Sequence, residues 1–581
     1  MKEVCYWVFC FVPVATPHPM KIFGFAEFLP AVALLVVVYT VADVRYKFRI
    51  AVAPGFLYAS TFSLIAVIGA QTLLTDIWLA QGWWVPRVLW LTPAIWQGIF
   101  GFMFLGAFLT WMYYGFIRPP IFGRRNARRF GRELYRYILR GNDDELKVIA
   151  NELVRSAKTL VRYSMSIPSR IGDKDAQPPH ARKQPSVERF AYDILLLIAN
   201  RKFCRHVVAS SPVTAQAFFE EMAKAQRFDI PLGYFARNIS GEAILQPDSF
   251  LYVEAEGFQS GLLGYLKPVS QAVYGNYQVV HALGDNLASP LEIHYEEIYS
   301  WTPNQWKAYC RAVLITLKNY LQEGWGSEHS PPVINRAFSN LNMAFRDAYK
   351  LDGVADPYNT DIYQRLSVVV NFVQDVVRFI NEMERPPTPF PKVHENTYPK
   401  NIYDNLGQLF FNMCFATSQM KGPSNATWMV HYVLVWDSLF DLDKRRGSRI
   451  VREKVCRLLY DEVCKLTRFS NYKGARVLGY CLYVLGVNAT PRRNTAFPRE
   501  AFALAKAVQS WARKGYLRMR AENKDVADAV LIGSLSFDEP KARLLKTYAK
   551  GLRHEAPTDY LQLDRPSPPR VTRRHSKRRH A

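Results

Sequence analysis

The chain has 581 residues, of which 49% are hydrophobic, and it carries a formal net charge of +24 at pH 7. This length and apolar content exclude a small disulfide-stapled domain and a wholly disordered chain, and they allow several folded regions. The positive charge does not by itself indicate nucleic acid as a partner, because no aromatic platform or groove-reading motif accompanies it.

Residues 1–21 form an N-terminal extension with two interpretations. Val4–Val14 is apolar but too short to cross a bilayer, and Pro13 interrupts it. One interpretation is a signal peptide, although Glu3 weakens the positively charged start that such a signal needs. The other is a segment upstream of a start at Met20, and we favour this second interpretation.

Three long apolar stretches follow and predict an anchor of three transmembrane helices over residues 22–117. The stretches are Ile22–Ala42, Ala51–Leu74 and Val88–Ile117. Each supplies the ~20 apolar residues that a helix needs to cross a hydrocarbon core of ~30 Å. A buried helix of a soluble domain would explain one such stretch but hardly three in succession. We therefore expect a multi-pass integral membrane protein.

Charged and aromatic residues near these stretches predict the orientation of the anchor. Residues 118–140 contain eight arginines and one glutamate, and basic residues also predominate between the first and second stretches. Positively charged residues are retained on the cytoplasmic side of a membrane. The segment around the second connection carries an aromatic belt of four tryptophans, Trp78, Trp83, Trp84 and Trp90. We expect a plasma (inner) membrane protein with its N-terminus outside and its C-terminal domain in the cytoplasm.

Small residues recur on one face of the third stretch, at Ala94, Gly98, Gly106 and Thr110. A stripe of this kind permits close approach of transmembrane helices. It predicts packing either within the three-helix anchor or between copies of the chain. No ionisable residue lies in the middle of a stretch, where it would indicate a transport path.

Residues 118–140 are predicted to form a basic juxtamembrane amphipathic helix. Arginines recur every four residues, and Phe130, Leu134 and Ile138 lie on a neighbouring face. Such a helix can lie in the headgroup layer, where each arginine near anionic lipid contributes ~1 kcal/mol. We expect lipid-headgroup contacts from six residues, Arg124, Arg125, Arg128, Arg129, Arg132 and Arg136. The alternative is that these charges only enforce the orientation of the anchor.

Residues 141–299 are expected to be helical, with a small β element near residues 240–285. Asn142 and Glu145 have the spacing of a capping box at a helix start. The β element is predicted because aromatic and β-branched residues in 249–254 and 277–280 are separated by several glycines.

Residues 300–555 are expected to form a large helical domain, followed by a disordered basic tail over residues 556–581. Thr302 and Gln305 form the cleanest predicted helix start, and we expect this helix to run to Glu323 and to stop at Gly324. The tail combines prolines with seven basic residues and no acidic residue from position 565 onward, which is typical of disorder.

Three groups of residues have weak resemblance to reactive sites. Asp248, Glu254 and Glu256 resemble the acidic part of a metal-dependent nuclease, but the usual lysine is missing. The other two groups are potential metal ligands, for which solvated loops are the better explanation: His294, Glu296 and Glu297, and His394, Glu395 and Asn396. We expect no metal site, and the eight cysteines form no C-x-x-C pair.

No phosphate-binding loop, zinc-protease, serine-hydrolase or kinase motif is present, so no cofactor is indicated. The leading interpretation is a membrane-anchored helical interaction or sensor protein without chemistry of its own, acting on the lipid bilayer and on a cytoplasmic protein or a second copy of itself. The first alternative is an oligomerising effector that permeabilises or conducts across the bilayer. The second is a membrane-anchored hydrolase with a site around residues 248–297.

Overall fold

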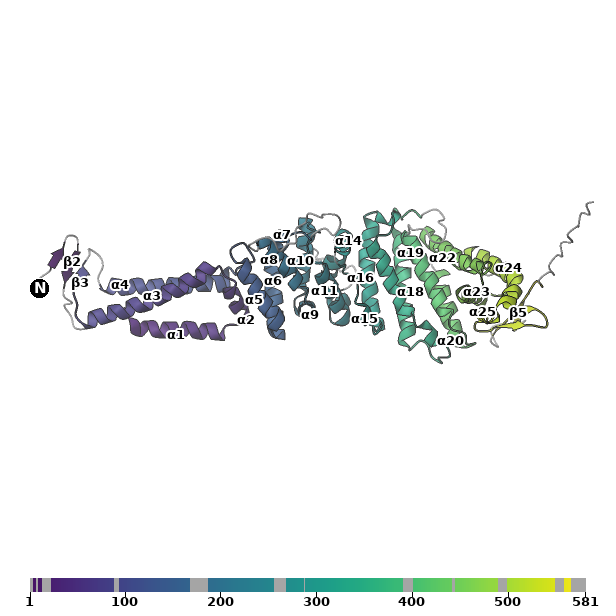
Figure 1. The fold of residues 1–581 in the computed structure, drawn as a ribbon, viewed down its shortest axis with the longest axis horizontal. Helices are drawn as coiled ribbons and strands as arrows, with labels where there is room; N and C mark the ends of the chain where they lie inside the picture. The colour runs from purple at the N-terminus through teal and green to yellow at the C-terminus, as the bar shows by residue number, and fades with distance from the viewer. Residues whose placement is uncertain are drawn as a thin grey trace, which may run out of the picture. The chain divides into compact units, whose positions relative to one another are not determined.

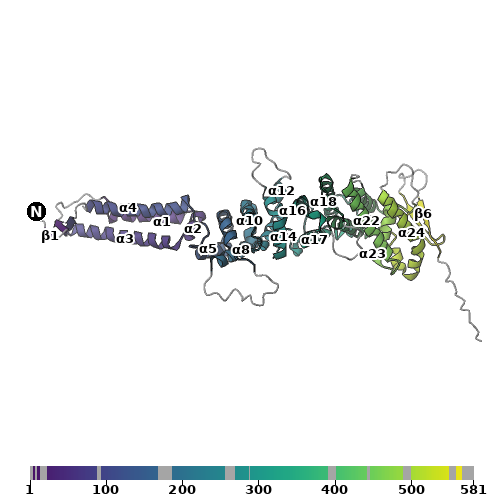
Figure 2. The same ribbon diagram turned by 90° about the horizontal axis from the view of Figure 1, so that it is seen from above.

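The computed structural model describes residues 4–6, 9–12, 22–87, 93–167, 186–254, 268–286, 288–389, 401–440, 445–488, 499–548 and 558–565. The chain divides into two compact units, residues 1–242 and 243–581, and the division falls within one helix. Figures 1 and 2 show that helices predominate throughout. The predicted fold class is confirmed: apolar helices near the N-terminus precede a large helical region, and strands are few, forming two small three-stranded sheets in the described part of the chain.

The first unit begins with short strands and continues with helices. Strands β1 (Val4–Tyr6), β2 (Phe9–Val12) and β3 (Val85–Arg87) form an antiparallel sheet in that order. The helices are α1 (Phe25–Val41), α2 (Val44–Ala51), α3 (Gly55–Ala80), α4 (Pro93–Met112), α5 (Ala127–Arg140), α6 (Asp143–Leu153), α7 (Ala157–Tyr163), α8 (Val187–Leu197), α9 (Arg201–Ser210), α10 (Pro212–Ala225) and α11 (Gly233–Leu245). A π-helical turn, Tyr113–Ile117, extends α4, and a 3₁₀ turn, Val154–Ser156, joins α6 to α7.

Helices occupy all three of the predicted membrane-spanning stretches. Ala59–Ala80 and Ala94–Ile117 are long and apolar enough to cross a membrane. Helix α1 has 17 residues and meets this standard only together with α2, from which it is bent by 110°. The described residues therefore contain two candidate spans, or three if the bent pair is counted as one. The segment between the first two stretches forms most of helix α2.

Polar side chains satisfy the N-terminal backbone of α1, where the first N–H groups of a helix have no partner within it. The Phe25 N–H donates to the Asp76 carboxylate at 2.9 Å, and the Ile22 N–H donates to the Gln97 side chain at 2.9 Å. The ionisable residue Asp76 at the end of α3 therefore has a structural role in joining the anchor helices.

The second unit is mainly helical. Its helices are α12 (Phe250–Val253), α13 (Val269–Tyr274), α14 (Tyr277–Asn286), α15 (Tyr295–Ile298), α16 (Pro303–Gln322), α17 (Pro332–Leu341), α18 (Asp361–Glu382), α19 (Ile402–Thr417), α20 (Asn425–Trp428), α21 (Ser438–Phe440), α22 (Arg446–Lys465), α23 (Tyr472–Leu485), α24 (Arg499–Glu522) and α25 (Lys524–Asp528). A nine-residue π-helix, Met429–Asp437, joins α20 to α21. Three 3₁₀ turns are Trp325–Ser327, Asn342–Phe345 and Ala348–Leu351.

The core of this unit lies between long helices. Helix α16 packs against α18, and α19 packs against α22. Asparagine pairs add polar links, because Asn405 donates to Asn335 at 3.1 Å and Asn412 donates to Asn342 at 2.9 Å. These bonds fix the register of α19 against α17 and the turn that follows it.

The predicted position of the β element near residues 240–285 is wrong. The two segments that were read as strands form α12 and α14, and α13 lies between them. Aromatic and β-branched residues such as Phe250, Val279 and Val280 are buried against neighbouring helices, so tertiary packing outweighs their strand propensity. Residues 255–267, which hold most of the glycines of the prediction, lie outside the described residues.

A second three-stranded antiparallel sheet lies near the C-terminus, with strands β4 (Leu535–Asp538), β5 (Arg543–Thr547) and β6 (Thr558–Gln562) in that order. Strand β6 falls within the tail that was expected to be disordered. Each of residues 558–562 is paired with a residue of β5, so this part of the tail is ordered and the expectation is corrected for it. Residues 566–581 lie outside the described residues.

Lys546 ties this sheet to the helices. Its side chain is buried, and Nζ donates to the Tyr483 carbonyl at 2.6 Å. The ammonium group also lies 4.9 Å from the ring centre of Tyr548 and 5.4 Å from that of Trp428. Burial of a lysine is costly unless its charge is compensated, and the carbonyl and the π faces provide that compensation.

Candidate membrane-proximal site

A buried ion pair joins the anchor to the helices that follow it. Arg49 in α2 makes two bonds to Glu152 in α6, from Nε at 2.8 Å and from Nη2 at 2.7 Å. The exposed fraction is 7% for the Arg49 side chain and 8% for that of Glu152. Arg45 contributes a further contact to Glu152 at 3.4 Å. This paired geometry is the arrangement in which a guanidinium group binds a carboxylate most strongly.

The ion pair also reaches the end of α4. Glu152 lies near the end of α6, which the 3₁₀ turn Val154–Ser156 joins directly to α7. Arg49 also donates from Nη1 to the Gly115 carbonyl at 2.9 Å. Gly115 belongs to the final π turn of α4, where carbonyl groups lack partners within the helix. One arginine thus links α2, α4 and α6.

Aromatic packing surrounds the ion pair. Phe48 in α2 is 3% exposed, and its ring lies 5.6 Å from that of Phe130 and 5.9 Å from that of Tyr137, both in α5. Asn126, at the start of α5, donates to the Val52 carbonyl at 2.9 Å, three residues before α3 begins. In Figures 1 and 2, α2 and α5 lie at the end of the bundle of α1, α3 and α4.

This packing corrects one part of the predicted juxtamembrane helix. Helix α5 forms as expected, but its apolar face is occupied by protein, since Phe130, Leu134 and Ile138 are all buried. That face is therefore not available for insertion into the headgroup layer. The opposite, basic face of α5 remains open to its surroundings.

The six arginines predicted to contact lipid are all exposed, namely Arg124, Arg125, Arg128, Arg129, Arg132 and Arg136. Arg136 pairs with Glu133 at 2.7 Å, and the Arg124 guanidinium lies 6.0 Å from the Tyr163 ring centre. Among the described residues, no acidic side chain forms an ion pair with Arg128 or Arg132. These two arginines occupy one side of α5, one helical turn apart.

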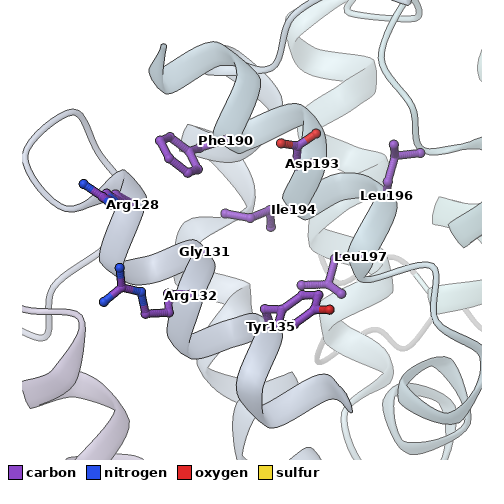
Figure 3. Close-up of a pocket in the computed structure, with 9 residues that line it drawn as sticks. All are labelled: Arg128, Gly131, Arg132, Tyr135, Phe190, Asp193, Ile194, Leu196 and Leu197. Carbon is purple, nitrogen blue, oxygen red and sulfur yellow. The ribbon is translucent and has the colours of Figure 1, made fainter. Parts of the chain in front are cut away.

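A surface groove of about 620 Å³ lies beside these two arginines, between α5 and α8. Figure 3 shows Arg128 and Arg132 on one side, with Asp193 and Leu196 across from them. The remaining lining residues are Gly131, Tyr135, Phe190, Ile194 and Leu197. The lining is thus mainly apolar, with cationic groups at one edge.

Gly131 faces the opposite wall of the groove at ordinary contact distance. A Cβ atom at this position would lie 3.6 Å from the Phe190 ring and 3.9 Å from Ile194, so a larger side chain would project into the groove. On the opposite wall, burial raises the pKa of the Asp193 carboxyl, while the charge of Arg189 acts in the opposite direction. The acidic group thus interacts with Arg189 on its own helix.

The two glycines of the predicted small-residue stripe do not pack against another part of the described chain. A Cβ atom added at Gly98 or Gly106 would have no atom within 4 Å, and Thr110 donates to the Gly106 carbonyl. The anchor packs instead through Gly69, against which the Phe28 ring lies, and through Gly101, against which Phe23 lies. Of the two expectations for the stripe, packing within the anchor is wrong for Gly98 and Gly106.

Of the acidic residues around position 250, Glu254 has a structural role. The two carboxylate oxygens of Glu254 accept bonds from the Val269 and Ser270 N–H groups, at 2.7 and 2.9 Å. Glu254 thus caps the N-terminal backbone of α13. Asp248 is exposed, and Glu256 lies outside the described residues.

The histidine groups of the prediction gain no support from the fold. His294 lies just before α15, with Glu296 exposed and Glu297 half-buried in that short helix. His394, Glu395 and Asn396 lie outside the described residues. Within the described part of the chain, no three His, Cys, Asp or Glu side chains are arranged to hold a metal ion.

Sequence reasoning missed the Arg49–Glu152 pair and the groove beside α5. The partners in the pair are 103 residues apart, and an arginine near a membrane is already explained by the orientation rule. Comparison of the chain with protein-family models, curated proteins and solved structures finds no match.

Proposed function

We propose that this protein is a membrane-anchored interaction protein, whose helical region receives a cytoplasmic protein partner and is mechanically joined to the membrane helices. The buried Arg49–Glu152 pair carries this proposal. A flexible tether would suffice to localise a domain at a membrane. A desolvated bidentate ion pair, with packed aromatic rings around it, instead makes α2, α4 and α6 move as one body, as transmission of a binding event requires.

The proposed topology has the N-terminus outside and the helical region in the cytoplasm of a plasma (inner) membrane. The exposed arginines of α5 support it, because they follow the last candidate span directly and positive charge is retained inside. Trp83 and Trp84, both exposed beyond the other end of α3, suit the opposite interface, where indole rings favour the headgroup level.

An oligomerising membrane effector is the second candidate function. The open faces of Gly98 and Gly106 favour it, because these positions allow another helix to approach closely and no helix in the described chain does so. The same stripe could hold together a dimeric interaction protein. The two functions differ in their effect on the bilayer, because only the effector would permeabilise it.

Cross-linking in intact cells, before detergent is added, tests the interaction function. We expect the full-length protein to form cross-links from residues 243–581 to another protein, giving species heavier than 66.8 kDa that contain a second polypeptide. Self-cross-links confined to α4, lost in Gly98→Leu and accompanied by ion leakage, would favour the effector. A protein recovered without any cross-link would contradict the proposed interaction function.

A further inference from the structure

We propose that the groove between α5 and α8 binds one anionic phospholipid, with its phosphate at Arg128 and Arg132 and an acyl chain along the apolar lining. This inference deepens the proposed function and rests on it, because it takes the anchor to be embedded in a bilayer. It names a specific ligand for two of the six arginines.

Charge provides the first argument. Arg128 and Arg132 lie one turn apart on the same side of α5, which places their Cβ atoms about 6 Å apart. Two guanidinium groups at this spacing can both donate to the oxygens of one phosphate. Both are exposed, and neither forms an ion pair with an acidic group in the described part of the chain, so their charge is available to a ligand.

The lining of the groove provides the second argument. Phe190, Ile194 and Leu197 give the groove an apolar lining, and in Figure 3 Phe190 and Ile194 lie toward the two arginines whereas Leu197 lies beside Tyr135. Tyr135 and Leu196, which also line it, are 58% and 38% exposed. A free phosphate or a soluble sugar phosphate would leave these apolar surfaces in water. A diacyl phospholipid has both the charge and the hydrocarbon that the groove requires.

The position of α5 provides the third argument. Asn126, at its start, is bonded to Val52, and α3 begins at Gly55. Arg128 and Arg132 follow Asn126 by two and six residues, a rise of about 3 and 9 Å along a helix. The groove therefore opens close to the level at which the chain enters the bilayer, where phospholipid is the most abundant amphiphile.

Native mass spectrometry of the full-length protein in detergent tests this proposal, with phosphatidylglycerol and phosphatidylcholine of identical acyl chains as probes. We expect one phosphatidylglycerol per chain, bound in preference to phosphatidylcholine. The double variant Arg128→Gln/Arg132→Gln should lose this binding about 30-fold, since each arginine contributes about five-fold near an anionic lipid. Arg125→Gln/Arg129→Gln removes the same charge from residues that do not line the groove and should change binding less than three-fold.

Two further variants test the apolar lining. Gly131→Leu places a side chain in the groove, and Tyr135→Ser removes an exposed part of its wall without disturbing a buried residue. Both should lower phosphatidylglycerol binding, and glycerol 3-phosphate should not displace the lipid. Equal losses in the two arginine double variants would overturn the proposal, as would full binding by both groove variants or displacement by glycerol 3-phosphate.

A dimer abolished by Gly131→Leu, in place of a lipid adduct, would also overturn the proposal by identifying a second copy as the occupant. These results are separable from a failure of the proposed function. A chain that remains in solution without detergent would contradict the membrane anchor itself, whereas a detergent-dependent chain without a lipid adduct would contradict only the lipid site.

Discussion

Glu152→Ala is expected to destabilise the full-length protein in detergent by about 3–5 kcal/mol, the usual loss when one partner of a buried ion pair is removed. The variant leaves Arg49 desolvated beside the Gly115 carbonyl with no counter-charge, and it also frees Arg45. Arg49→Met should cost less, because Glu152 keeps its contact with Arg45. Denaturant unfolding followed by tryptophan fluorescence measures both effects.

Glu133→Ala is the matched control for this prediction. Glu133 also pairs with an arginine at 2.7 Å, but Arg136 is 58% exposed whereas Arg49 is 7% exposed. An exposed pair contributes less than about 1 kcal/mol, so this variant should stay close to the unmodified protein. The double variant Arg49→Met/Glu152→Leu should be more stable than Glu152→Ala. Equal losses for Glu152→Ala and Glu133→Ala would contradict a desolvated junction.

His431 is expected to make the protein lose stability as the pH falls from about 6.5 to about 4. The imidazole is fully buried within the π-helix, and Nε2 lies 2.7 Å from the Thr417 carbonyl, so this nitrogen carries the proton of the neutral ring. Burial lowers the pKa of His431 from 6.5 to about 4, although the Thr417 carbonyl and the charge of Asp352 oppose this shift.

The sign of the effect follows from proton binding. Above pH 6.5 the histidine is neutral in both states, so its contribution to stability is complete. Between pH 6.5 and 4 the unfolded chain binds a proton that the folded state does not accept, and this favours unfolding by up to about 3 kcal/mol at pH 4. His431→Gln retains a donor for Thr417 but cannot titrate, so its stability should fall less steeply over this range.

The measurement is the free energy of unfolding of the unmodified protein and of His431→Gln between pH 8 and 4.5. The carboxylates are common to both proteins, so their contributions cancel when one free energy is subtracted from the other. Parallel curves for the unmodified protein and His431→Gln would show that His431 is not buried in its neutral form.

Local signals in the sequence predicted the helix ends well. Asn142 with Glu145, and Thr302 with Gln305, both form the reciprocal capping boxes that their spacing predicts. Helix α16 ends at Gln322, and Gly324 follows with a φ of +88°, a conformation that suits glycine. These features depend on residues within a few positions of one another, so no knowledge of the tertiary fold is needed.

The predictions that failed depend on distant contacts. Helix α2 has only eight residues and gains its stability from Glu152 and from the rings of α5, none of which a local pattern reveals. Glu254 was grouped with potentially reactive residues because the sequence does not reveal its structural role. The backbone N–H groups that it binds lie 15 and 16 residues away. The groove beside α5 depends on the approach of α8 to Gly131, which only the tertiary structure defines.

The most direct test of the proposed membrane anchor and its orientation is labelling of single cysteines with a membrane-impermeant maleimide. Cys5 and Cys10 are first replaced by serine, because both lie on the side that is proposed to be outside. Of the remaining six cysteines, five are buried and Cys464 is half-buried. Gln81→Cys and Lys541→Cys then introduce exposed thiols at the end of α3 and in the turn before β5.

In intact cells the proposed topology predicts labelling of the Gln81→Cys variant, and labelling of the Lys541→Cys variant only after the membrane is opened. The unsubstituted serine background controls for residual reaction at Cys464. Labelling of the Lys541→Cys variant in intact cells, with the Gln81→Cys variant protected, would place the helical region outside and contradict the proposed cytoplasmic interaction function.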